Sequence, residues 1–466
     1  MAAAGQIESG AAGRTVLGHP IGLIDLFGVD LWERFSFYGM LTILGYYLYY
    51  SLTDGGLELP KATATGIVGA YGGRVYFSTV LGGWIADRVL GMERTVFYGG
   101  VVVMFGHIAL AVVPGLAGVA SGLVLVALGS GALKANASSL LGTLYEKDDP
   151  RCDGGFTLFY PSAFVGPLLT GLLQTRLGFH YGFGAAAVGM ALGLTQYVVF
   201  RRNLGDHGRN VPNPLPRSNI GWVVSIAVAA VSVVVVAFVT GLVELSNLSQ
   251  VTTGVIVAAS VVYFVVMLTS SKVVPIERTR LRAFIPLFIA NAVFWSLFQQ
   301  IFTVLAVYSD ERMNWSIFGW TAPSSWIGSI EHVWIILLSP VFAITRTRLG
   351  GRAPITPRKF AYGVIGMGLA FLLFLPMSGT TGRAVPALLV VGIMVVFAIS
   401  ELLLSPIGLS VTTKLAPEAF RAQMMALDFF SVGIGTSMSG VLSGYYDPAH
   451  EFAYFGIIGT SMEGVH

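Results

Sequence analysis

The chain has 466 residues, of which 55% are hydrophobic and only 11% are charged, and it contains 58 glycines. Soluble domains carry roughly a quarter of their residues as charges, so this composition and a mean hydropathy of +0.75 indicate an integral membrane protein. The formal net charge of +3 is spread over many short segments, which argues against a nucleic-acid partner, and the single Cys152 excludes an intrachain disulfide. We expect the first twenty residues to be a short tail and not a signal peptide.

Apolar runs of about 20 residues, the length of a helix that crosses a bilayer, recur along the chain. A polar linker, "RRNLGDHGRNVPNPLPRSN" (201–219), divides them. Two runs after it, 220–245 and 251–269, contain almost no internal polar groups beyond serine, threonine and tyrosine, and we expect them to face lipid. Six runs precede the linker and five follow the inserted pair: 23–50, 64–86, 95–116, 119–144, 156–177 and 181–200, then 281–308, 324–345, 360–377, 385–414 and 420–445.

The last apolar run, 452–462, would reach only about half of a 30 Å hydrocarbon core at about 1.5 Å per residue. We therefore expect the last helix to be truncated.

Most of the 27 lysines and arginines lie in loops on the side of the first tail. By the positive-inside rule the amino terminus is cytoplasmic, and we expect a multi-pass protein of the inner (plasma) membrane.

Six helices, a linker and six more is the layout of the major facilitator fold, an all-α membrane fold whose substrate site lies at mid-membrane between the halves. We expect an N-terminal six-helix bundle (1–200), a linker with two inserted transmembrane helices (201–272), and a C-terminal bundle with an incomplete last helix (273–466). A weak internal repeat supports two related halves: a basic turn with glycines occurs in each, "GGWIADRVLGMERT" in the first and "ITRTRLGGRAPITPRK" in the second. An unrelated multi-span enzyme is the alternative.

Charges inside apolar runs are costly and by default indicate function. Positions 30, 33 and 34 of "DLWERFSFYGM" share one helix face, and depth counting allows Glu33, Arg34 and Lys134 to meet; a structural ion-pair cluster is the alternative. For Arg74 and Asp428 we consider an ion pair between packed helices, with a substrate-binding role as the rival. The interior charges are Asp30, Glu33, Arg34, Arg74, Lys134, Glu331, Glu401 and Asp428.

At these residues the chain resembles the proton-dependent oligopeptide transporters of the major facilitator superfamily. The family's first-helix pattern E-x-x-E-R-F-x-Y-Y-G-M reads "DLWERFSFYGM" here. The resemblance continues through "GGWIADRVLG", "LKANASSLLGTLY", "GFTLFY", "FW" with "QQ", and "SELLLSPIGLSVTTKLAPEAFRAQMMAL", and it includes the two inserted helices. It covers nearly the whole chain.

The resemblance implies a role for each matching residue. Glu33 matches the proton-binding carboxylate, Arg34 the guanidinium that pairs with it or holds the peptide carboxylate, and Lys134 the partner ammonium. A carboxylate between two cations loses its proton easily and regains it when a substrate occupies Arg34, which couples the proton to the substrate. The remaining implied residues are Glu401, which faces the peptide amino terminus; Tyr38, Tyr71 and Trp295, which line the cavity or simply pack; and Asp87, Arg88 and Arg94, a cytoplasmic gating latch or topology-setting charges.

Several positions depart from the family pattern, and they fall on the binding site. An acid is lost at Gln299, beside Gln300, and another is gained at Glu331, which we include among the substrate-binding residues. Leu41 and Phe164 replace an arginine and an asparagine that would grip a peptide backbone. The other departures are Asp30 for glutamate, Phe37 for tyrosine and Asp428 for tryptophan.

The expected function is import of di- or tripeptides with protons by alternating access, by a protein that is not an enzyme and needs no cofactor. An alternative keeps the proton chemistry for nitrate, an amino-acid derivative or a modified peptide. A membrane-embedded enzyme or sensor is a remote third, since no "HExxH" or "GxSxG" occurs. His332 beside Glu331 points about 100° away on a helix, so we expect no metal site. We expect a monomer whose partners are a small-molecule substrate, protons and the lipid membrane.

Overall fold

The computed structural model describes residues 15–16, 19–144, 165–206, 208–317, 319–349 and 354–460. The described chain is almost entirely helical. Its longer helices are α1 (Gly22–Tyr49), α2 (Lys61–Ile85), α3 (Met92–Val112), α4 (Gly115–Thr143), α6 (Val165–Leu177), α7 (Phe179–Phe200), α8 (Arg217–Val239), α9 (Leu248–Thr269), α10 (Pro275–Phe298), α11 (Val304–Glu311), α12 (Ile327–Leu349), α13 (Thr356–Leu372), α14 (Ala387–Leu415), α15 (Arg421–Ser443) and α16 (Glu451–Thr460).

Short elements complete the description. A π-helical turn, η2 (Ala86–Leu90), ends α2. The short 3₁₀ turns are η1 (Leu52–Asp54), η4 (Arg201–Leu204), η5 (Leu245–Asn247), η6 (Gln299–Phe302), η7 (Ser324–Trp326), η9 (Leu375–Met377) and η10 (Glu418–Phe420). Three two-residue strand pairs join β1 (Thr15–Val16) to β2 (His19–Pro20), β3 (Met313–Asn314) to β6 (Val385–Pro386), and β4 (Ser316–Ile317) to β5 (Trp320–Thr321); the β3–β6 pair is parallel and the others are antiparallel.

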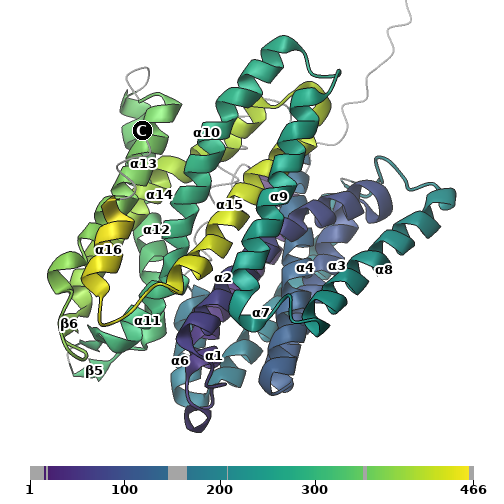
Figure 1. Cartoon of the computed structure of the whole chain (residues 1–466). Coiled ribbons are helices and arrows are strands. Elements are labelled where there is room, and N and C mark those ends of the chain that lie inside the picture. Colours follow the sequence, from purple (N-terminus) through teal and green to yellow (C-terminus); the bar gives the residue numbers. More distant parts are fainter. Residues whose placement is uncertain are drawn as a thin grey trace, which may run out of the picture.

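The helices gather into two bundles that lie side by side (Figure 1). In the first, α1, α2, α3, α4, α6 and α7 pack on one another; in the second, α10, α12, α13, α14, α15 and α16 do so. The bundles meet mainly where α2 packs against α15, with further contacts of α1 and α6 against η6, α11, η7 and α12. This is the expected pairing of the second predicted span with the penultimate one.

A close approach of backbones holds α2 against α15. A Cβ atom built on Gly69 would lie 2.6 Å from the Cα of Gly440, closer than real side chains tolerate. Thr65, one turn earlier on α2, accepts a hydrogen bond from Ser443 across the same contact (2.8 Å). The glycines therefore set the distance between the two bundles.

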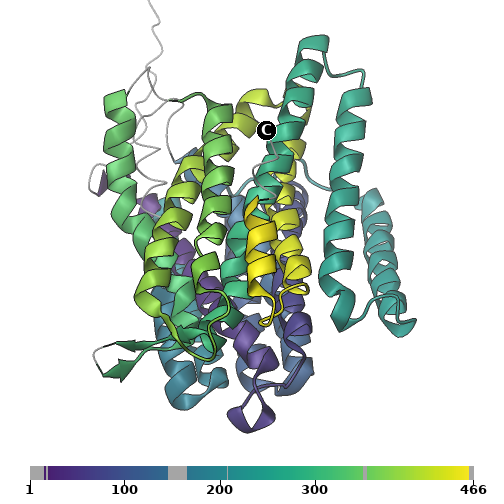
Figure 2. The same ribbon diagram turned by 60° about the vertical axis from the view of Figure 1, so that its left-hand side comes forward.

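The inserted helices differ from the expectation that both face lipid passively. α8 has no buried residue and lies outside the bundles, as expected (Figure 2). α9 instead packs against both α2 and α15, and Thr253 donates a buried hydrogen bond to Ser437 at 2.8 Å. The Thr253 hydroxyl of α9 therefore lies at the contact with α15.

Two predicted boundaries were wrong for identifiable reasons. The predicted span 95–116 ends earlier, at Val112, because Pro114 lacks a backbone donor and Gly115 takes a left-handed φ of 73°. The predicted span 281–308 is one membrane span, but its helix breaks at η6, and Thr303 has φ −118° and ψ −90°. The last helix, α16, has ten residues and packs on α13.

Ten helical stretches of the described residues are long and apolar enough to cross a membrane. α1 and α2, with 28 and 25 residues, have sufficient length but fall outside that set. In α1, the charged side chains of Asp30, Glu33 and Arg34 in its middle turns lower the hydropathy of the helix. These are also the residues of greatest functional interest.

Candidate functional site

Glu33 of α1 is fully inaccessible to solvent. Lys134 of α4 donates to its Oε2 at 2.8 Å, and Ser130, one turn earlier on α4, donates to its Oε1 at 2.9 Å. Both carboxylate oxygens are thus satisfied, as a buried charge requires. The predicted meeting of Glu33 with Lys134 is confirmed.

The resemblance implied that Arg34 either pairs with Glu33 or holds a substrate carboxylate, and in the structure it pairs with Asp30 and not with Glu33. Its Nε lies 2.6 Å from Asp30 Oδ2, one turn back on the same helix, and its side chain remains 28% exposed. Asp30 is buried. The spacing of four residues that places both on one helix face also explains this pairing, so "DLWER" contains two separate ion pairs, one internal to α1 and one reaching α4.

Aromatic rings surround the two pairs. The Lys134 ammonium lies over the Phe37 ring, 4.5 Å from its centroid, and Phe37 contacts Tyr71 of α2. Tyr38 packs edge-on against His332 of α12, with ring centroids 4.7 Å apart. Tyr71 is buried, and its hydroxyl has no hydrogen-bond partner among the described residues. Three of the predicted aromatic and basic residues therefore lie within one cluster.

Trp295 of α10 lies elsewhere. It is partly buried, packs edge-on against Phe298, and its Cβ lies close to Gly435 of α15. Its position between α10 and α15 agrees with the simple packing interpretation as well as with a lining role.

The second bundle contributes two acids that face each other. Glu331 of α12 is fully buried and Glu401 of α14 is 9% exposed, and their carboxyl groups lie within hydrogen-bonding reach of each other. Arg34 of α1 acts on Glu401 and His332 through its charge. The structure thus brings Glu401, Glu331, Arg34 and Tyr38 to the same region between the bundles.

His332 was expected to point away from Glu331. Its Nδ1 nevertheless lies 3.2 Å from Glu331 Oε2, while also contacting the Gly328 carbonyl oxygen at 3.1 Å. A search of the described residues finds no group of three metal-ligating side chains.

The predicted latch lies at the end of α2. Asp87 accepts hydrogen bonds from the Asn213 side chain of the linker (3.2 Å) and lies 3.9 Å from Arg88. Arg94 is exposed, and within the described part of the chain it pairs with neither residue. The stronger ion pair here joins buried Glu93 to Arg201 at 2.8 Å, which sequence reasoning missed because Arg201 is far along the chain.

Arg74 and Asp428 do not form the ion pair that we considered. Asp428 Oδ1 accepts from Thr412 at 3.1 Å on α14, and the described residues contain no ion pair of Arg74. α2 and α15 do pack together, but the contacting faces carry glycine, serine and threonine.

The structure also shows the surroundings of other residues that depart from the family pattern. Leu41 is a core residue, 3% exposed, and Gln300 accepts a hydrogen bond from Tyr454 at 2.9 Å. Gln299 is also buried. Phe164 lies outside the described residues.

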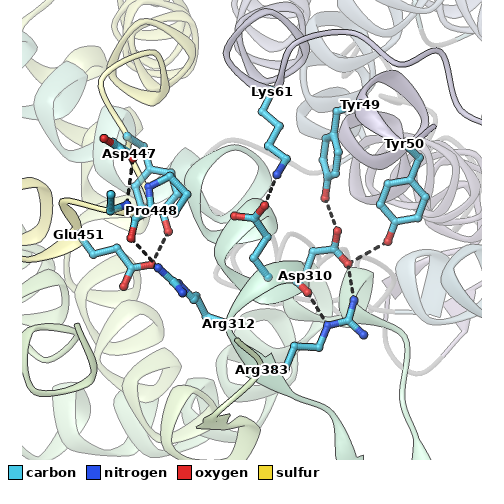
Figure 3. A network of polar contacts seen from close by, with 12 residues as sticks. Tyr49, Tyr50, Lys61, Asp310, Arg312, Arg383, Asp447, Pro448 and Glu451 are labelled. Carbon is cyan, nitrogen blue, oxygen red and sulfur yellow. Dashed lines mark hydrogen bonds and ion pairs between the residues drawn. The ribbon is translucent and has the colours of Figure 1, made fainter. Parts of the chain in front are cut away.

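A network that the sequence did not predict closes the bundles at the end where α1 finishes (Figure 3). Tyr49 and Tyr50 of α1 donate to the Asp310 carboxylate of α11 at 3.0 and 2.9 Å, and Arg383 also contacts Asp310. Lys61 of α2 pairs with Glu311. The contacts of Tyr49, Tyr50 and Lys61 join residues at least 250 positions apart, and Arg383 lies 73 positions from Asp310, so no local pattern could have revealed them.

A second part of this network lies within the later bundle. Arg312 donates to Glu451 of α16 at 2.7 Å, and Tyr446 donates to the same Oε1 at 2.9 Å. The hydrogen bond with Glu451 holds the pKa of Arg312 above its ordinary value. This pair fixes the short α16 against the end of α11.

A hollow of about 490 Å³ lies between α1, α6 and α7. It is lined by apolar side chains such as Trp32, Phe35 and Leu169, and it contains none of the predicted site residues. The candidate site is therefore the charged region where the two bundles meet.

A buried ion pair in one bundle of membrane-spanning helices and two facing acids in the other are typical of a secondary transporter, since such groups bind ions and polar solutes at mid-membrane. The profile of the POT family matches residues 93–458. An uncharacterized transporter of Bacillus subtilis (strain 168) is 44% identical over 450 residues, which is 95% of this chain and 91% of the relative. A di-/tripeptide transporter of Lactococcus lactis subsp. cremoris is 39% identical over 465 residues, 96% of this chain and 93% of that one.

Solved structures agree with these relatives. A peptide transporter POT in complex with sulfate superimposes with a TM-score of 0.91 at 42% identity, covering 97% of this chain and 94% of the other. A POT family transporter in complex with 5-aminolevulinic acid gives a TM-score of 0.90 at 36% identity, with 97% and 96% covered. The chain belongs to the POT family of transporters, an all-α membrane family with a fold of the major facilitator type.

Proposed function

We propose that the protein imports di- and tripeptides together with protons by alternating access. The observation that carries this proposal is the buried Glu33–Lys134 pair beside Arg34, in a chain whose Lactococcus relative is named a di-/tripeptide transporter. The transport cycle makes and breaks no covalent bond in the substrate, so we propose no enzymatic activity.

The chemistry of the pair explains how a proton would be coupled. Lys134 and Ser130 both stabilise Glu33 as a carboxylate. Glu33 takes up a proton when Lys134 turns to another anion, such as the carboxylate of a bound peptide. The proton and the peptide then neutralise the site together, which favours movement of the loaded site across the membrane.

A zwitterionic peptide has two ends that fit opposite sides of the site. Arg34 and Lys134 of the first bundle suit its carboxylate, and Glu401 and Glu331 of the second suit its amino group. Tyr38, Tyr71 and Trp295 would pack against the peptide between these ends. A ligand that binds both bundles favours the state in which they close around it.

The two bundles, residues 1–200 and 273–466, would rock as units about the α2–α15 contact, with 201–272 as the linker segment. We place the amino terminus in the cytoplasm, in a plasma membrane, and the Tyr49 end outside. The network on Asp310 is then an extracellular gate, and Asp87, Arg88 and Arg94 belong to the cytoplasmic side. We propose a monomer as the transporting unit, since both halves of the site lie in one chain.

A second candidate substrate is an amino-acid derivative or a modified peptide. Leu41 lies in the core and offers no charge to a peptide backbone. A relative with 36% identity was solved in complex with 5-aminolevulinic acid, which has an amino group and a carboxylate but no peptide bond. The same two ends of the site suit such a molecule. Nitrate, which has no amino end, uses only the first bundle's cations.

Uptake into liposomes with an imposed inward proton gradient tests the proposal. Dialanine and trialanine should accumulate, and 5-aminolevulinic acid and nitrate distinguish the second candidate. No accumulation of any peptide by folded protein contradicts peptide import. Glu33→Gln should still exchange labelled dialanine across the membrane without concentrating it, and normal gradient-driven uptake by this variant would remove Glu33 from the proton role.

A further inference from the structure

Glu331 and Glu401 form a contact that two carboxylates cannot maintain. Glu331 is fully buried on α12, and neither of its oxygens has a hydrogen-bond donor among the described residues. Glu401 of α14 is nearly as buried, and one of its oxygens, Oε2, is also without a donor. The two carboxyl groups nevertheless lie within hydrogen-bonding reach of each other.

An ionised carboxyl group accepts hydrogen bonds but has no hydrogen to donate. Two ionised groups at this separation would repel each other, and burial would deprive both of the water that stabilises their charge. One proton resolves both problems. It removes one of the two charges, and it supplies the donor that turns the contact into a short, charge-assisted hydrogen bond.

The surrounding groups do not replace that proton. His332 lies 3.2 Å from Glu331, but its Nδ1 also contacts the Gly328 carbonyl oxygen, which takes the hydrogen of that nitrogen. Of the other described titratable groups, Arg34 and Tyr38 of α1 and Tyr76 of α2 act on Glu401 from the first bundle. Only Arg34 is a cation, and Asp30 already neutralises it at 2.6 Å.

The geometry points to a second proton-binding site in this transporter, in which one proton is held between Glu331 and Glu401 and resides on the more deeply buried Glu331. The inference rests on the proposed function only in taking this proton to be one that moves with the substrate. The neighbouring span carries the buried Gln299 and Gln300, amides that cannot take up a proton.

A singly protonated pair also suits the proposed substrate. It carries one negative charge in total, which matches one ammonium group. Substrate binding at Glu401 therefore leaves the proton on Glu331, and the substrate and the proton cross the membrane together. A doubly ionised pair would instead leave one charge unmatched in the closed site.

Infrared difference spectroscopy of the purified full chain tests the site directly. The carbonyl stretch of a protonated glutamic acid should be present in the wild type at neutral pH and should shift when the protein is labelled with ¹³C-glutamate. Glu331→Gln should remove this band. Glu401→Gln should retain it at a higher frequency, because an amide accepts the hydrogen bond more weakly than a carboxylate.

Glu93→Gln is the matched control, since Glu93 is equally buried but paired with Arg201 at 2.8 Å and has no need of a proton. A wild type without a label-sensitive band overturns the proposal even if every variant fails to fold. An unchanged band in Glu331→Gln, or an unchanged frequency in Glu401→Gln, also overturns it.

The transport measurement separates this inference from the proposed function. Relative to its own rate of labelled dialanine exchange, Glu331→Gln should accumulate at least tenfold less dialanine under the proton gradient than the wild type does. Wild-type protein that transports no peptide contradicts the proposed function and leaves the infrared result intact. Full accumulation by Glu331→Gln contradicts a transported proton at this pair while peptide import stands.

Discussion

The gate on Asp310 gives a prediction whose size follows from the structure. Tyr49→Phe combined with Tyr50→Phe removes two hydroxyl donors between the bundles, at 3.0 and 2.9 Å from Asp310, and leaves both rings in place. A hydrogen bond to a charged group contributes about 1.5–3 kcal/mol. Asp310 keeps Arg383 and Ser324 as hydrogen-bond partners. Its charge therefore stays compensated in the variant, and we take the lower end of that free-energy range, about 1.5 kcal/mol, for each lost bond.

Two such bonds amount to about 3 kcal/mol, and 1.4 kcal/mol is tenfold in an equilibrium constant, so the equilibrium should shift by about a hundredfold toward the state open at the Tyr49 end. Spin labels report this opening by double electron–electron resonance. Suitable sites are cysteines at Leu52, which is 67% exposed, and at exposed Thr381, in a chain with Cys152 replaced by serine. The long-distance population should grow in the double variant.

Tyr308→Phe is the matched control. The Tyr308 hydroxyl is buried at the same end but has no hydrogen-bond partner among the described residues, and its ring packs on Phe374. Its removal should leave the distance distribution unchanged. The reasoning is refuted if the double variant matches the wild type, or if Tyr308→Phe opens the gate as strongly.

Three further changes have defined outcomes. Lys134→Ala leaves the buried Glu33 charge without its cation, so thermal stability measured by differential scanning fluorimetry at neutral pH should fall by the equivalent of about 3–5 kcal/mol; an unchanged melting temperature would count against this. Gly69→Val places a side chain 2.6 Å from the α15 backbone and should abolish folded protein in size-exclusion chromatography, whereas a monodisperse variant would contradict the close packing. Arg312→Ala leaves the buried Glu451 without its cation and should cost about 3–5 kcal/mol of stability, but without changing the pH dependence of exchange.

The fold was largely predictable from the sequence because a bilayer imposes one length on every span. Apolar runs therefore located the helices to within a few residues at most ends. The errors occurred where local backbone conformation decides: α3 ends early before Pro114, and the helix that follows Pro275 is interrupted by the 3₁₀ turn Gln299–Phe302 inside a largely apolar run. Hydropathy does not register either effect, since both depend on backbone geometry.

The site was predictable only in part. Charges in apolar runs identified Glu33 and Lys134 because burial makes them costly, and counting residues from the loops placed them at a similar depth. Periodicity could not decide whether Arg34 turns to Glu33 or to Asp30, which lies one turn away on the same face. It also could not bring Tyr49 to Asp310 or Glu331 to Glu401, since those contacts depend on how whole helices are arranged.

The Asp30–Arg34 pair bears on how a substrate carboxylate is bound. The contact of 2.6 Å occupies the guanidinium that the proposed mechanism assigns to that carboxylate. Asp30 therefore competes with the substrate for Arg34. Asp30→Asn keeps the shape of the side chain but removes its charge. Arg34 should keep its position without Asp30, because it also interacts with the charge of Glu401. Relieving the competition should therefore outweigh the loss of positioning.

We expect Asp30→Asn to bind dialanine about fivefold more tightly, corresponding to about 1 kcal/mol for a partly exposed charged pair, as measured by isothermal titration calorimetry in detergent. Dialaninamide, which has the same amino end but no carboxylate, separates the charge effect from a change in packing. Its affinity should not rise. A gain of equal size for both ligands would mean that Asp30 acts on the shape of α1, and a loss for dialanine alone would mean that Asp30 positions Arg34 for the substrate instead of competing with it.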